Sequence, residues 1–70
     1  MDVDLLMREL AAGDPTLDEL WCVFGFTGVP ELRRATFRLL LQQGISDRSL
    51  GFASHLFPEL REEAQAALLQ

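Results

Sequence analysis

The chain has 70 residues, 49% of them hydrophobic, and six Lys/Arg residues against eleven Asp/Glu residues give a formal net charge of −5. This length supports a single domain over residues 1–70, which buries only about 60% of the surface of its unfolded chain. One cysteine excludes an internal disulfide, and one Cys with one His cannot supply a four-ligand Cys/His zinc site. The acidic balance argues against binding to duplex nucleic acid, whose affinity comes mainly from neutralised phosphates. The mean hydropathy of +0.12 is nevertheless high for so small an acidic chain.

The first predicted helix has one apolar face and ends at Gly13. The residues of this face follow helical spacing: Val3, Leu6, Met7, Leu10 and Ala11. Asp14 as N-cap, followed by Pro15 at the first helical position, predicts the start of a second helix. Thr16 and Glu19 could instead form a capping box slightly later, so two start points remain open.

Three more helices are predicted after the second, which ends at Gly28. A third runs from Pro30 to a C-cap at Gly44, a fourth is capped by Ser46, and a fifth begins at Pro58. In the fourth helix the residues expected to face inward are Leu50, Ala53, Leu56 and Phe57. The third helix also carries apolar residues outside its main stripe, so we expect neighbours on more than one side of it. No segment alternates long enough to predict a strand.

An internal repeat relates the two halves of this pattern. A shift of 28 residues aligns residues 24–42 with residues 52–70, and eight of the 19 pairs are identical. The helices then alternate between two types, which predicts that the first pairs with the second, the third pairs with the fourth, and the fifth is left unpaired with an uncovered apolar edge. Small residues at Thr36 and Ala64 suit close approach of neighbouring helices.

Residues 30–40 and 58–68, which both begin Pro-Glu-Leu-Arg, resemble the first helix of short HEAT-like repeats of the phycobilisome-lyase type. The resemblance implies an all-α fold of five helices arranged as two and a half helical-hairpin repeats, a short α-solenoid. It also implies a scaffold or adaptor role. The alternative fold is a compact five-helix bundle of death-domain or sterile-alpha-motif size.

The residues offer little catalytic chemistry. His55 is the only histidine, and we expect it at a surface or helix end. Cys22 lies among apolar neighbours, which predicts a buried structural thiol. The Gly25–Gly28 segment lacks the lysine and the preceding strand of a phosphate loop. We therefore expect no enzyme, no cofactor, no metal and no small-molecule substrate.

Charge is distributed unevenly along the chain. Residues 1–28 sum to −5, whereas residues 29–43 sum to +2 because Arg33, Arg34 and Arg38 lie there. Three arginines on one helix could touch an acidic partner, a second copy or a phosphate, or could pair with acids of the same chain. Direct nucleic-acid binding is disfavoured because it requires a larger basic footprint.

The sequence favours a non-catalytic protein–protein interaction module that self-associates, with a two-fold homodimer expected and the protein partner unknown. The candidate partner-binding residues are Trp21, Phe24, Phe26, Arg34, Arg38 and Leu69. The alternative function is an acidic inhibitor or DNA mimic that occupies a nucleic-acid-binding site. No stretch is apolar enough for a membrane span, the acidic N-terminus is unlike a signal peptide, and the lone thiol suits a cytoplasmic protein. The absence of lysine and asparagine hints at a bacterial, GC-rich coding sequence.

Overall fold

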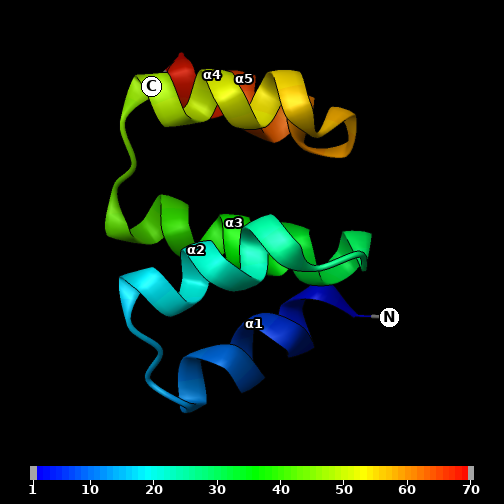
Figure 1. Ribbon diagram of the computed structural model, residues 1–70, viewed down its shortest axis with the longest axis vertical. Coiled ribbons are helices and arrows are strands. Elements are labelled where there is room, and N and C mark those ends of the chain that lie inside the picture. The colour runs from blue at the N-terminus through cyan, green and yellow to red at the C-terminus, as the bar shows by residue number, and fades with distance from the viewer. Residues whose placement is uncertain (1, 70) are drawn as a thin grey trace.

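Figure 1 shows a computed structural model of the chain, which describes residues 2–69. Within that range the fold is all-α, as predicted, and contains no β-strand. The elements are α1 (Val3–Ala12), α2 (Leu17–Phe26), α3 (Pro30–Gln43), α4 (Asp47–Leu56), the short 3₁₀ helix η1 (Pro58–Leu60) and α5 (Arg61–Leu68). They occupy a body of 29 × 22 × 20 Å.

The helices form three layers. In Figure 1 the antiparallel pair α4–α5 lies at the top, the antiparallel pair α2–α3 lies in the middle, and α1 packs on α3 from below. The predicted pairing of helices is therefore wrong, because the helix without a hairpin partner is α1 and not the fifth helix. The sequence repeat agrees with the observed pairing, because residues 24–42 and 52–69 each contain the end of one helix, a turn and the helix that follows it. The repeated unit is thus a hairpin that begins with an even-numbered helix.

Thr16 is the N-cap of α2. The Thr16 Oγ1 accepts a hydrogen bond from the Glu19 N–H at 3.1 Å and donates one to the Glu19 carboxylate at 3.2 Å, so α2 has the Thr16 start, with the Glu19 side chain contacting the hydroxyl and not the Thr16 N–H. The Asp14–Pro15 start is wrong. Asp14 has φ of 49°, and its N–H donates a hydrogen bond to the Ala11 carbonyl. It therefore belongs to the turn that follows α1 and its C-cap Gly13.

The fifth helix starts differently from its prediction. Pro58 begins the 3₁₀ turn η1, and the α-helical hydrogen bonding of α5 starts only at Arg61. Leu60 ends the 3₁₀ turn and is completely buried. The tighter turn lets Leu60 reach the core at the point where the chain reverses between α4 and α5.

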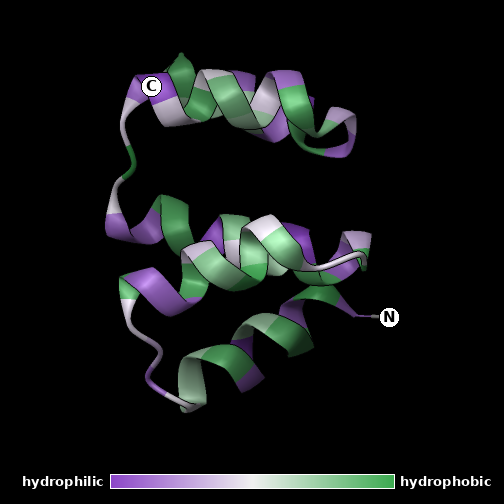
Figure 2. Ribbon diagram, viewed as in Figure 1, coloured by the Kyte–Doolittle hydropathy of each residue, from purple (hydrophilic) through white to green (hydrophobic). Residues whose placement is uncertain are grey.

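The core lies on α3, which has neighbours on more than one side, as predicted. Five consecutive or nearly consecutive side chains of α3 are buried: Ala35, Thr36, Phe37, Leu39 and Leu40. Figure 2 shows hydrophobic residues on α1 and α2, which pack toward this helix, and on the α4–α5 pair above it. Thr36 and Ala64 are both fully buried, as expected for small residues between closely packed helices. The Thr36 hydroxyl donates to carbonyls one turn earlier, at 2.9 and 3.1 Å, so its burial leaves no unpaired polar group.

Candidate functional site

Arg33 of α3 forms contacts within its own hairpin, α2–α3, and with the second hairpin, α4–α5. Its Nε donates to the Phe24 carbonyl at 3.2 Å, its Nη1 donates to Glu59 Oε1 at 2.9 Å, and its Nη2 donates to the Thr27 carbonyl. The guanidinium also lies 4.1 Å from the centre of the Phe57 ring, within cation–π range. One planar side chain therefore joins the C-terminal end of α2 to the turn between α4 and α5.

Glu59 is held in its ionised form by this arrangement. A hydrogen bond from its own backbone N–H, and then the hydrogen bond from Arg33, hold the pKa of Glu59 below its ordinary value near 4.5. Both contacts favour the carboxylate over the protonated acid. The pairing of the hairpins is consequently coupled to the charge of Glu59.

Arg34 and Arg38, two predicted partner-binding residues, are paired within the chain. Arg34 Nε lies 3.1 Å from Glu63 Oε1, and its Nη2 donates to the Glu59 carbonyl at 3.0 Å. Arg38 Nε lies 3.5 Å from Glu63 Oε2, and its Nη1 lies 3.4 Å from Asp4 Oδ1. These arginines are half-exposed and link α3 to α5 and α1. Their contacts correspond to the intramolecular pairing that the sequence analysis left open.

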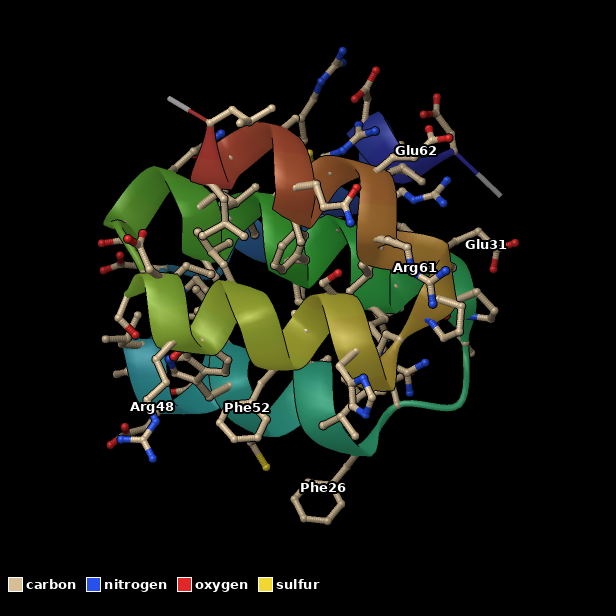
Figure 3. All side chains as sticks on the ribbon, turned by 90° about the horizontal axis from the view of Figure 1, so that it is seen from above. Phe26, Glu31, Arg48, Phe52, Arg61 and Glu62 are labelled. Carbon is tan, nitrogen blue, oxygen red and sulfur yellow. The ribbon has the colours of Figure 1, made fainter. Side chains whose placement is uncertain are left out.

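A groove of about 350 Å³ runs between α2 and α4 on one face of the molecule. Its walls are mostly apolar and consist of Trp21, Phe24, Gly25, Ser49, Phe52, Ala53, Leu56 and Phe57. On its rim, Phe52 is 58% exposed and Leu56 is 61% exposed, and Phe26 at the end of α2 is 87% exposed. Figure 3 shows Phe26, Phe52 and Arg48 projecting on the side formed by α2 and α4, whereas Glu62 projects on the opposite side. We call this groove and its rim, including Asp18, Phe26 and Arg48, the α2–α4 surface.

The aromatic residues predicted to bind a partner differ in their exposure. Phe26 is exposed, and Trp21 is half-buried at the wall of the groove. The expectation that Phe24 offers exposed surface is wrong: it is only 5% exposed and packs against Trp21, Phe37 and Phe57 with ring centres 5.2–5.9 Å apart. Phe24 therefore supports the groove from beneath.

Leu69, directly after α5, is 88% exposed, yet it is not part of the α2–α4 surface. The inward-facing side chains of η1 and α5 before it, Leu60 and Ala64, are fully buried against the core. The predicted uncovered edge of the fifth helix is therefore limited to its last turn, where Leu68 is also partly exposed. The inward face of the rest of the helix is covered because it pairs with α4.

Sequence reasoning missed the two residues that contribute most to the rim from α4. Leu56 was expected inward and is exposed, and Phe52 was not singled out. The signal was present, because Phe52 and Leu56 are four residues apart and form a second apolar stripe beside Leu50 and Ala53. Cys22 was expected to be buried and is also exposed, since it lies two residues from the inward-facing Leu20 and so on the opposite side of α2.

Other candidate sites carry less chemistry. A cleft of about 480 Å³ lies between the C-terminal half of α3, the loop after it, and α5, and its charged groups include the already paired Arg38 and Glu63. His55 is exposed in the last turn of α4. Among residues 2–69 no group of three or more His, Cys, Asp or Glu side chains could hold a metal ion. No helix within the same range is long and apolar enough to cross a membrane.

Comparisons with protein-family models, with curated proteins and with solved structures find no match for this chain. The site is therefore interpreted from its own geometry.

Proposed function

We propose that this protein is a non-catalytic protein–protein interaction module that binds through the α2–α4 surface. The observation that carries the proposal is the exposure of Phe52 and Leu56 beside an apolar groove, with Phe26 at the end of the same face. If a phenylalanine offers about 200 Å², the two phenylalanines alone leave about 290 Å² of aromatic surface in solvent. The largest exposed apolar patch on a protein is often functional.

We interpret the scaffold as a short solenoid of HEAT-like hairpins, in which α1 is the half repeat. The coincidence of the sequence repeat with the hairpins α2–α3 and α4–α5 supports this interpretation. So does the equivalent burial of Thr36 and Ala64. In such an arrangement α2 and α4 occupy equivalent positions, and stacking of the hairpins creates the groove between them.

The alternative function, an acidic inhibitor or DNA mimic, receives less support. A mimic requires a surface of unpaired acids, but Asp4, Glu59 and Glu63 are engaged by the arginines of α3.

Comparative capture tests the proposal. Immobilised wild-type protein and a Phe52→Ser variant are exposed to the same source lysate at low bait density, with Leu5→Ser as the matched control. Leu5 is 50% exposed and lies on α1, away from the groove. We expect proteins retained by the wild type to be retained by the control and lost with Phe52→Ser. Equal retention by both variants, or no specific retention by any of the three proteins together with no self-association, would contradict the proposed function.

A further inference from the structure

We propose that the partner seated on the α2–α4 surface is a second copy of this chain, related by a two-fold axis that runs along α2 and α4. This inference rests on the proposed function and specifies its partner. It follows from the placement of charge, the direction of the two helices and the shape of the groove.

The α2–α4 surface carries charges of both signs at the N-terminal end of its helices. Asp18 lies in the first turn of α2, on the helical face that it shares with Trp21 and Gly25 of the groove. Arg48 lies in the first turn of α4, on the face that it shares with Phe52, and it projects on the same side in Figure 3. Among residues 2–69 neither Asp18 nor Arg48 forms an ion pair. This arrangement of charges is complementary to the same arrangement on a second copy of the chain.

The two helices run in the same direction, each with its N-terminal end on the left in Figure 1. A two-fold axis along that direction exchanges the positions of α2 and α4 while it preserves their direction. It therefore sets α4 of one copy against α2 of the other, with both N-terminal ends together. Arg48 of each copy then meets Asp18 of the other, so that the ion pair forms twice.

The same rotation brings matching shapes together. Phe52 and Leu56 on α4 of one copy are set against the part of α2 that contains Trp21 and Gly25 in the other. At Gly25 an added Cβ would meet no atom within 4 Å, so the backbone there is open to an incoming side chain. The exposed Phe26 extends the apolar contact toward the other end of the helices. The interface then joins four helices, with an apolar centre and both ion pairs at the N-terminal end of the helices.

A stable interface removes about 800 Å² from each partner, which is about one sixth of the 4749 Å² accessible on this chain, so the contact must include the rim as well as the groove. A partner with a single dominant charge would meet repulsion from either Asp18 or Arg48, whereas a second copy satisfies both. Because each copy has a net charge of −5, apolar contact must supply the affinity, and the ion pairs fix the register.

Sedimentation equilibrium across a concentration series tests the proposal on the full chain. We expect the wild type to dimerise within a series that reaches about 500 µM and Phe52→Ser to weaken dimerisation by at least about tenfold. Arg48→Asp and Asp18→Arg should each weaken it by about tenfold, since each reversal acts at two contacts, and the double variant should recover the wild-type constant. Arg61→Asp is the matched control, an exposed arginine on α5, and should leave the constant unchanged. Circular dichroism confirms that each variant is folded.

Three results would overturn the inference. A wild type that stays monomeric up to about 500 µM excludes the second copy as partner. In that case the capture experiment still decides the proposed function, because it is carried out at low bait density. A Phe52→Ser variant that dimerises like the wild type places the interface elsewhere. Two weakened single charge reversals without recovery in the double variant exclude the two-fold register.

Discussion

Arg33 should contribute more to stability than any other charged side chain of the domain. It is 14% exposed and donates three hydrogen bonds, to Glu59 and to the carbonyls of Phe24 and Thr27. Replacement by alanine removes all three, together with the cation–π contact to Phe57. Since the first hairpin supplies the two carbonyls and the second supplies Glu59 and Phe57, the loss should loosen the packing of one hairpin on the other.

The magnitude follows from the contacts. A hydrogen bond with one charged partner contributes about 1.5–3 kcal/mol, but the partial exposure of Glu59 and the access of water to the carbonyls reduce this contribution. We expect Arg33→Ala to lower the free energy of unfolding by about 2–4 kcal/mol in total. A 70-residue domain has about 3.5–10 kcal/mol available, so the variant should lose a large part of its stability. The Tm should fall by roughly 10–25 °C.

Urea denaturation followed by far-ultraviolet circular dichroism at neutral pH measures this loss. The internal repeat supplies the control, because Arg61 is the equivalent of Arg33 in the second hairpin but is exposed. Arg61→Ala should change the free energy of unfolding by no more than about 0.5 kcal/mol. If the two variants lose the same stability, or if Arg33→Ala stays within about 0.5 kcal/mol of the wild type, the hairpins are not joined through Arg33.

Three further predictions concern single side chains. The pKa of Glu59 is lowered in the folded state, so the contribution of its carboxylate to stability is fully present above the unfolded pKa near 4.5 and is lost as the pH falls through the folded pKa. The difference in free energy of unfolding between the wild type and Glu59→Gln, measured in urea titrations, should therefore shrink between pH 7 and pH 3. A constant difference would refute the coupling. Thr16→Ala should cost about 1 kcal/mol through loss of the α2 cap, and a Thr16→Ala variant that melts like the wild type would contradict this cap. The exposed thiol of Cys22 should react with a disulfide reagent in dilute native protein nearly as fast as in denaturant, and protection under those conditions would contradict its exposure.

The residues that break or cap helices made most of the secondary structure predictable. Gly13, Pro30, Gly44 and Ser46 all lie at the helix boundaries expected of them. Competing local signals limited the prediction at Asp14–Pro15 and at Pro58, where two alternative starts differ by only a few residues. At the start of α2 the Thr16 hydroxyl decides, because it accepts the hydrogen bond that caps the helix. At Pro58 the 3₁₀ turn is accompanied by the complete burial of Leu60.

The candidate site was less predictable, because exposure depends on which side of each helix has a neighbour. The sequence identified α2 as aromatic-rich but could not distinguish Phe24, which packs under the groove, from Phe26, which points into solvent. It likewise showed arginines one turn apart on α3 without showing that Glu63 of α5 lies between them. Such contacts join residues about 25 positions apart, and no local pattern records them.

By itself the sequence determined the all-α class, the helix boundaries at Gly13, Pro30, Gly44 and Ser46, and the presence of a repeat, because these depend on backbone preferences and spacing within a few residues. Only the tertiary structure decided which helices pair, and the choice moved the unpaired position from the fifth helix to α1. That choice depends on the packing of side chains from distant segments: α1 packs on α3, which also pairs with α2, and α4 pairs with α5. The same packing left Phe52 and Leu56 exposed and so created the α2–α4 surface.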